Sequence, residues 1–202
     1  MKTTLTTIAI SCAAANLFAQ APNSQPITPP PPQKLNAGAL STDSKPIQLL
    51  DPSEWQNWKE SLGEWKFDGG VLTGTGASGI HYNRTFKAPF QITFVFEMLE
   101  GTRPAVSGFG RYSLMTEGVG KTLAIHPTAP KAGGFHYDLK RKYRVKINIT
   151  EEKLELRINN RLIDTRKPGM AEVPPLRFSA GDGYSQGIAR FSEIEITAKP
   201  KE

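Results

Sequence analysis

The stretch "EWKFDGGVLTGTG" (residues 64–76) decides the fold. Two runs with apolar and β-forming residues flank Asp68, Gly69 and Gly70. Asp-Gly and Gly-Gly pairs are typical of tight hairpin turns, because these residues tolerate the positive φ angles that such turns need. The stretch therefore predicts a β-hairpin, with one strand up to Asp68 and a second strand after Gly70.

Two further stretches have apolar residues at alternate positions, "FQITFVFEML" (residues 90–99) and "YRVKINI" (residues 143–149). Alternate side chains of a strand point to the same face, so each stretch predicts a strand with one buried face. The residues expected to face the core are Phe90, Ile92, Phe94, Phe96, Tyr143, Val145, Ile147 and Ile149. Those expected to face water in the second stretch are Arg144, Lys146 and Asn148.

The second half of the chain continues this pattern. "KLELRINNRLIDT" (residues 153–165) predicts another hairpin, whose turn is Asn159-Asn160. The apolar alternation slips by one position between Phe191 and Ile194, which predicts a β-bulge. Many short strands separated by turn residues predict an all-β protein, an antiparallel β-sandwich.

One segment alone has helical spacing, "DPSEWQNWKESL" (residues 51–62), with Asp51 or Ser53 as its expected N-cap. The residues that would share a face of this helix are Trp55, Trp58 and Leu62.

Gly74, Gly76 and Gly79 have the spacing G-x-G-x-x-G. A dinucleotide-binding loop with this spacing has to open a helix, because the helix N-terminus supplies the amides that bind the pyrophosphate. Here the following residues, "IHYNRTF", favour another strand. We interpret the glycines as a turn or bulge between strands, and this excludes a nucleotide cofactor; no other cofactor is expected.

The N-terminal residues 1–21 predict a signal peptide, with Lys2, a short apolar run and a small-x-small cleavage site that ends at Ala21. The protein is then secreted or periplasmic. Cys12, which is the single cysteine, lies inside this segment, and the alternative is a lipoprotein modified at Cys12. No segment reaches the ~20 apolar residues of a membrane span.

Residues 22–46 predict a linker, because they include four consecutive prolines that favour an extended conformation. The folded domain is expected at residues 47–198. The formal net charge of +6 is compatible with an anionic partner and equally with a role in solubility alone. Without interleaved basic and aromatic residues on one sheet, nucleic acid is not an expected partner.

Four motifs occur in an order that is similar to a known family: "WKFDGGVLTGTG" (residues 65–76), "FKAPFQITFVFE" (residues 86–97), "KYRVKINITEEKLELRINNRLI" (residues 142–163) and "FSEIEI" (residues 191–196). The order resembles the concanavalin A-like lectin/glucanase superfamily, and most nearly the exported bacterial 3-keto-disaccharide hydrolases, known as domain of unknown function 1080. The resemblance implies a concanavalin-like jelly roll that binds or cleaves carbohydrate.

Candidate site residues follow from the resemblance and from residue chemistry. Glu97 stands where the strand of the family ends in Glu, and Arg103 and Arg111 follow it. A Glu–Arg pair either binds sugar hydroxyls or ends the strand as a salt bridge. The expected catalytic residues are Glu97, Arg111 and His126. The expected ligand-binding residues are Tyr82, Arg103, Tyr112, His136, Asp182 and Tyr184. The spacing of His81, His126 and His136 matches no local metal motif, so no metal is predicted.

Three functions remain open at this point. The first is a domain that binds glycans, neutral or anionic, without turnover. Val106 favours this function, because it replaces the Asn of the family's Asn-Ser-Gly turn. The second is a glycoside hydrolase or lyase that acts on 3-keto-glycosides. The third is an adhesion or scaffold domain that binds protein.

Overall fold

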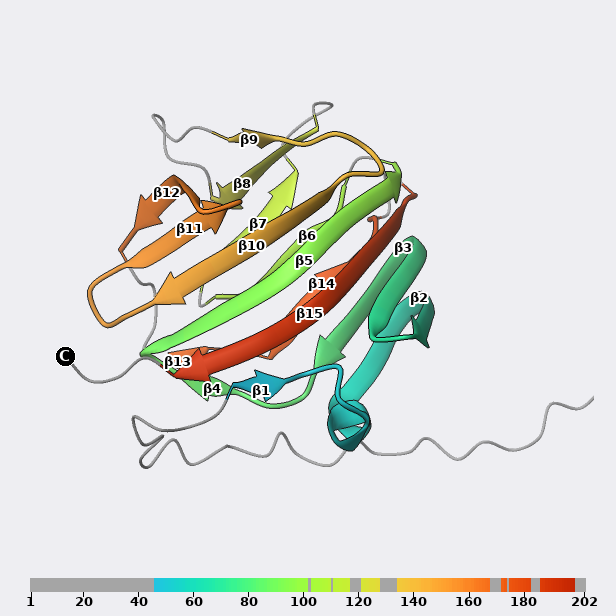
Figure 1. Ribbon diagram of the computed structural model, residues 1–202, viewed down its shortest axis with the longest axis horizontal. Coiled ribbons are helices and arrows are strands. Elements are labelled where there is room, and N and C mark those ends of the chain that lie inside the picture. The colour runs from blue at the N-terminus through green and yellow to red at the C-terminus, as the bar shows by residue number, and fades with distance from the viewer. Residues whose placement is uncertain are drawn as a thin grey trace, which may run out of the picture. The chain divides into compact units, whose positions relative to one another are not determined.

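Figure 1 shows the computed structural model of the chain. The chain divides into two units, residues 1–30 and 31–202, and every described residue belongs to the second. The predicted signal peptide, Cys12 and the predicted linker up to residue 45 lie outside the described residues. The structure describes residues 46–101, 103–109, 111–116, 121–127, 134–167, 172–173, 175–182 and 186–198.

The elements are strands, apart from one short 3₁₀ helix. Their bounds are β1 Ile47–Gln48, η1 Pro52–Asn57, β2 Trp58–Asp68, β3 Val71–Tyr82, β4 Phe86–Lys87, β5 Phe90–Glu100, β6 Ala105–Phe109, β7 Tyr112–Thr116, β8 Thr122–His126, β9 Phe135–His136, β10 Lys142–Ile149, β11 Leu154–Ile158, β12 Arg161–Arg166, β13 Glu172–Val173, β14 Leu176–Ser179 and β15 Ile188–Ala198. All the pairings between them are antiparallel, which confirms the predicted all-β sandwich.

The strands form two layers that share β3 (Figure 1). The first layer has the order β12-β11-β10-β5-β15 and ends on residues 71–75 of β3. The second layer begins with residues 79–82 of β3 and continues through β14, β6, β7, β8 and β9. Strand β2 accompanies β3 through both layers. Gly63 and Gly76, with φ angles of 71° and 76°, lie where β2 and β3 change layer, and this left-handed backbone suits glycine.

Both predicted hairpins are confirmed. Asp68 pairs with Val71 across Gly69 and Gly70, whose φ angles are 55° and 77°. Ile158 pairs with Arg161 across Asn159 and Asn160. The predicted bulge of β15 is also confirmed, because the register shifts between Ser192 and Glu195 around Glu193, whose φ is 50°.

Aromatic side chains form the centre of the core. Phe178 on β14 lies 5.8 Å from Phe94 on β5 and 5.0 Å from Phe191 on β15, measured between ring centroids. These contacts cross from the second layer to the first. The predicted inward residues of β5 and β10 are all buried.

One detail of β10 differs from the predictions. Asn148, expected to face water, is only 8% exposed, because Gln91 and Glu155 lie beside it on the neighbouring strands. β10 is not an edge strand, since β5 and β11 flank it on both sides.

The predicted helix of residues 51–62 is wrong beyond Asn57. Asp51 caps the short η1, and β2 begins at Trp58. The Trp58 ring is buried, and its indole N–H donates to the Leu49 carbonyl at 2.7 Å. Leu62, expected on the same helical face, is 57% exposed on β2. Pairing of the whole of β2 with β3 satisfies more backbone groups than a second helical turn would.

The G-x-G-x-x-G glycines lie inside β3 and not in a turn, but the expected alternative of a bulge fits, because the register with β2 shifts between Leu62 and Glu64 while β3 passes from Gly79 to Thr75. At Gly74 and Gly79 the side chain of another residue lies close to the backbone of β3. A Cβ at Gly74 would come within 2.6 Å of the Trp65 ring, and one at Gly79 within 2.8 Å of the Arg177 guanidinium. The strand continues to Tyr82 and no helix opens after the glycines, as predicted.

Candidate functional site

The outer face of the second layer carries a continuous row of polar residues. Backbone register places one residue of each neighbouring strand in this row, from β2 to β8. Four members, His81, Arg177, Ser107 and Ser113, lie between buried residues of their strands, so these side chains and their register partners point away from the core. The row is Lys59, His81, Arg177, Ser107, Ser113 and His126.

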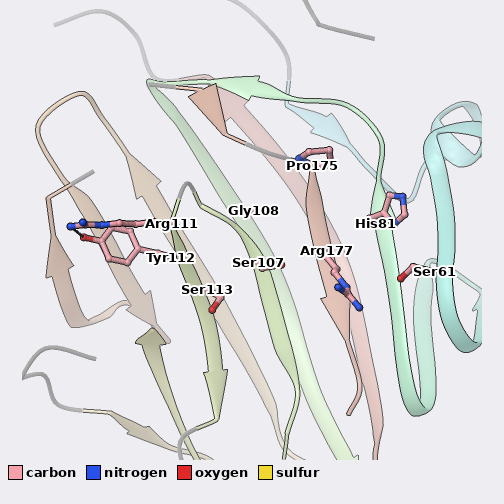
Figure 2. Close-up of a pocket in the computed structure, with 9 residues that line it drawn as sticks. All are labelled: Ser61, His81, Ser107, Gly108, Arg111, Tyr112, Ser113, Pro175 and Arg177. Atoms are coloured by element: carbon pink, nitrogen blue, oxygen red, sulfur yellow. Dashed lines mark hydrogen bonds between the residues drawn. The ribbon is translucent and has the colours of Figure 1, made fainter. Parts of the chain in front are cut away.

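A pocket of about 580 Å³ lies on this face. Figure 2 shows His81 and Arg177 on neighbouring strands near Ser61, with Arg111 and Tyr112 at the other end. No acidic side chain occurs among the described residues that line it. The pocket therefore offers mainly hydrogen-bond donors and positive charge. The polar side chains that line it include Ser61, His81, Ser107, Arg111, Ser113 and Arg177.

The Arg177 side chain lies across β3 at Gly79. A Cβ at Gly79 would come 2.8 Å from Nη2 and 3.1 Å from Nε of Arg177. The same Cβ would come 2.9 Å from Oγ of Ser61, which donates a hydrogen bond to the Gly79 carbonyl at 3.0 Å. Glycine at this position thus gives the guanidinium and the Ser61 hydroxyl room on the floor of the pocket.

His81 lies between two cations. Its register partners are Lys59 on β2 and Arg177 on β14. Partial burial lowers the pKa of the His81 imidazole, and the positive charges of Arg177 and Lys59 lower it further. His81 is therefore neutral at pH 7 and can both donate and accept a hydrogen bond.

Arg111 and Tyr112 form the other end of the pocket. Nη2 of Arg111 donates to the Tyr112 hydroxyl at 3.0 Å, and the guanidinium lies 5.1 Å from the centroid of the Tyr112 ring. The Tyr112 ring is buried in the core, so it holds the arginine at the rim of the sheet. Both residues were predicted as site residues, and both line the pocket.

Glu97 lies elsewhere. On β5 of the first layer it pairs in register with Lys142 and Arg190, and the Arg190 guanidinium is 3.7 Å from its carboxylate. It lines a separate pocket of about 240 Å³. The structure therefore does not bring Glu97 together with Arg111 and a histidine, because the two layers present their outer faces in opposite directions.

The remaining predicted residues are dispersed. Arg103 pairs with Asp182 at 3.1 Å, which brings two of them together outside the residues that line the 580 Å³ pocket. His126 ends the polar row on β8, and His136 is exposed on the edge strand β9. Tyr184 lies outside the described residues.

Tyr82 has a structural position. Its ring is fully buried, and its hydroxyl donates to the Glu54 carboxylate, which also pairs with Arg84 at 3.0 Å. Burial and the hydrogen bond to Glu54 raise the pKa of the Tyr82 hydroxyl. Since Tyr82 is turned into the core, it does not offer its ring to a ligand on the outer face.

Sequence reasoning missed Arg177, Ser61, Ser107 and Ser113 as site residues, and it assigned His81 no role. A signal was present: Arg177 stands between the apolar Leu176 and Phe178 in "LRFS", so it had to point outward. The sequence did not show that β14 pairs with β3 and β6, which is what brings these side chains together.

Neither a metal site nor a membrane helix is evident in the described part of the chain. There, no three His, Cys, Asp or Glu side chains gather as ligands for a metal ion. Its one helix is also too short and too polar for a bilayer span.

Comparison with known proteins gives a structural likeness alone. No family model matches the sequence, and no curated protein matches it. A sialidase superimposes with a TM-score of 0.55 at 12% identity over 72% of this chain, which spans 17% of the length of that sialidase.

Two smaller proteins are matched over nearly their whole length. Carbohydrate-binding module CBM66 from Bacillus subtilis has a TM-score of 0.54 at 14% identity, covering 68% of this chain and 93% of its own. A putative glycosyl hydrolase from Parabacteroides distasonis has a TM-score of 0.55 at 12% identity, covering 77% of this chain and 100% of its own. At such identities the likeness establishes the β-sandwich fold. The narrower resemblance to 3-keto-disaccharide hydrolases stays a prediction.

Proposed function

We propose that this chain is a carbohydrate-binding domain that holds a glycan on the outer face of its second layer without cleaving it. The observation that carries the proposal is the pocket of about 580 Å³, lined by arginine, histidine and serine side chains. Pockets of roughly 300–1,000 Å³ suit small ligands, and a few convergent polar groups orient them. The hydroxyl oxygens of a sugar can accept hydrogen bonds from these side chains.

The choice of binding over cleavage follows from the chemistry of the lining. Glycoside hydrolysis generally uses two carboxylates about 5–10 Å apart. The described residues around this pocket supply hydroxyls, an imidazole and guanidinium groups instead. The match to a carbohydrate-binding module over 93% of that module's length supports the same choice.

The test is binding of the full chain to a glycan array, followed by calorimetry on the glycans that respond. We expect binding that Arg177→Ala weakens by about tenfold or more, since loss of a charged hydrogen bond costs about 1.5–3 kcal/mol. Arg161→Ala is the matched control, because Arg161 is exposed on β12 of the first layer. The absence of any bound glycan, or equal losses in both variants, would contradict the proposal.

A second candidate is a glycoside hydrolase or lyase that acts on 3-keto-glycosides. Glu97 favours it, because this carboxylate lines the pocket of about 240 Å³ with Asp68 and Arg190. The full-length match to a putative glycosyl hydrolase supports it as well. Turnover of a 3-keto-glycoside by the wild type that Glu97→Gln abolishes would establish this activity in place of simple binding.

The proposal places the domain outside the cytoplasm, on the evidence of the signal-like residues 1–21. N-terminal sequencing of the protein from cell fractions checks this. A mature N-terminus after Ala21 indicates secretion or a periplasmic location, and a lipid-modified Cys12 indicates a lipoprotein.

A further inference from the structure

We infer that the ligand is an acidic glycan, and that Arg177, with His81 and then Lys59 beside it, binds a carboxylate on one of its sugars. This inference rests on the proposed function and deepens it. It concerns the end of the pocket formed by β2, β3 and β14, which we call the basic end.

The basic end concentrates positive charge. Lys59, His81 and Arg177 are consecutive partners across three neighbouring strands and lie on the same outer face. Neighbouring strands are about 4.8 Å apart, so Lys59 and Arg177 leave their strands roughly 10 Å apart, with the imidazole between them. An anion above His81 lies within reach of both cations. Both Lys59 and Arg177 then attract it, and the attraction increases as the distance between opposite charges falls.

Arg177 differs from most other arginines of the domain. Carboxylates neutralise Arg84, Arg103, Arg141, Arg144, Arg166 and Arg190. Arg177 forms no ion pair or hydrogen bond with another residue of the described ranges, and it is exposed. A guanidinium at the floor of a pocket that pairs with no carboxylate of the protein is suited to bind a carboxylate of a ligand.

The position of the guanidinium is defined by Gly79 beneath it. The Nη2 and Nε atoms of Arg177 lie 2.8 and 3.1 Å from where a Cβ of residue 79 would stand. This close approach holds the guanidinium over β3 at Gly79, and a guanidinium can offer two parallel N–H groups to a planar carboxylate. Lysine cannot reproduce this two-point contact, because its ammonium is a single charge centre.

Neighbouring hydroxyls suit the rest of the sugar. Ser107 is the register partner of Arg177 on β6, and Ser113 is the partner of Ser107 on β7. Together with Ser61 they line the same pocket. A carboxylate bound at Arg177 therefore leaves the sugar hydroxyls beside a line of serines that leads toward Arg111.

Calorimetry with matched ligands tests the inference. The probes are oligomers of galacturonic, glucuronic and mannuronic acid, each beside its methyl ester, which has the same ring without the charge. We expect one of the acids to bind the full chain at least tenfold more tightly than its ester. Arg177→Ala should remove this preference, and Arg177→Lys should restore only part of it. Arg161→Ala should leave it unchanged.

A second measurement reports the site directly. Bound carboxylate should raise the pKa of His81 in NMR titrations, because it offsets the charges of Arg177 and Lys59. The methyl ester should leave this pKa unchanged. Such a readout distinguishes a carboxylate at the basic end from one bound elsewhere.

The outcomes separate this inference from the proposed function. Equal affinity for acid and ester, or acid binding that Arg177→Ala leaves intact, overturns the inference alone. Binding of neutral glycans from the array and of none of the acids does the same. Binding of no glycan at all overturns both.

Discussion

At the residue scale, two glycines of β3 serve opposite faces of the sheet. Gly74 lies under the Trp65 ring, which packs toward the core, and Gly79 lies under Arg177 on the outer face. Neither has the positive φ that marks Gly76. The absence of a side chain, and not backbone freedom, is therefore what these two positions require.

Alanine should destabilise the protein at Gly74 much more than at Gly79. Gly74→Ala should destabilise the protein by about 1–3 kcal/mol, because the rigid Trp65 ring cannot move away. Gly79→Ala should change the free energy of unfolding by less than about 1 kcal/mol, because the end of the Arg177 side chain can shift and the loss of glycine's unfolded-state entropy compensates. It should nevertheless weaken glycan binding. Urea unfolding and calorimetry of both variants check this, and equal destabilisation would contradict it.

The pKa of His81 is a second residue-scale prediction. Its lowered value means that the unfolded chain takes up a proton at a higher pH than the folded chain does. Stability is therefore lost as pH falls through the unfolded value, and the loss is complete once pH is below the folded value. The charged groups that face His81 are Lys59 from β2 and Arg177 from β14.

Removing one of these charges should move the titration. Arg177→Ala should raise the pKa of His81 in NMR spectra, and Arg177→Lys should leave it close to the wild-type value because the charge stays. An unchanged pKa in Arg177→Ala would mean that Arg177 does not contribute to the lowered pKa, which burial and Lys59 would then account for.

At the scale of elements, the turn between β11 and β12 holds two non-glycine residues in left-handed conformation. The φ angles are 49° at Asn159 and 65° at Asn160. The Asn159 side chain accepts a hydrogen bond from the Arg144 backbone N–H at 2.9 Å, so it also ties the hairpin to β10. The Asn160 carbonyl accepts a hydrogen bond from the Arg157 guanidinium. The role of the Asn160 side chain is to tolerate the positive φ.

Substitutions in this turn should separate the two roles. Asn160→Gly should stabilise the protein by up to about 1 kcal/mol, because Asn-Gly is the preferred pair for a two-residue turn. Asn159→Ala should cost about 1–3 kcal/mol, since it loses the hydrogen bond and puts alanine at a positive φ. Thermal or urea unfolding measures both. Destabilisation by Asn160→Gly would show that the turn has another geometry.

At the scale of the whole molecule, the two layers are joined by the aromatic centre of the core. Phe178 is fully buried and contacts Trp58, Phe94 and Phe191, so it bridges β14 to the first layer. Its chain neighbour Arg177 points the other way, into the pocket. One short strand therefore contributes to both stability and the proposed site.

Adjacent substitutions on β14 should show this division. Phe178→Ala should cost about 3–5 kcal/mol, because it leaves a cavity between the layers. Arg177→Ala should change stability by about 0.5 kcal/mol or less, as is usual for exposed positions. Chemical denaturation of the two variants, with binding measured in parallel for Arg177→Ala, provides the comparison. A large loss of stability in Arg177→Ala would make its role structural.

Much of the secondary structure was predictable, because the relevant forces are local. Asp68-Gly69-Gly70 and Asn159-Asn160 defined turns through their tolerance of positive φ. Alternation identified the buried faces of β5 and β10. The helix expected to reach Leu62 failed because spacing alone does not report that β2 finds a partner in β3 along its whole length.

The sequence by itself determined an all-β sandwich, its main hairpins and the direction in which Arg177 points, since alternation and turn chemistry act between near neighbours. The tertiary structure alone decided that Arg177 lies beside His81 and Ser107, and that Glu97 lies on the other layer. The physical reason is that the backbone hydrogen bonds between two strands are chemically the same whichever strands pair. Any two amphipathic strands can pair, and the packing of the whole core selects which of them do.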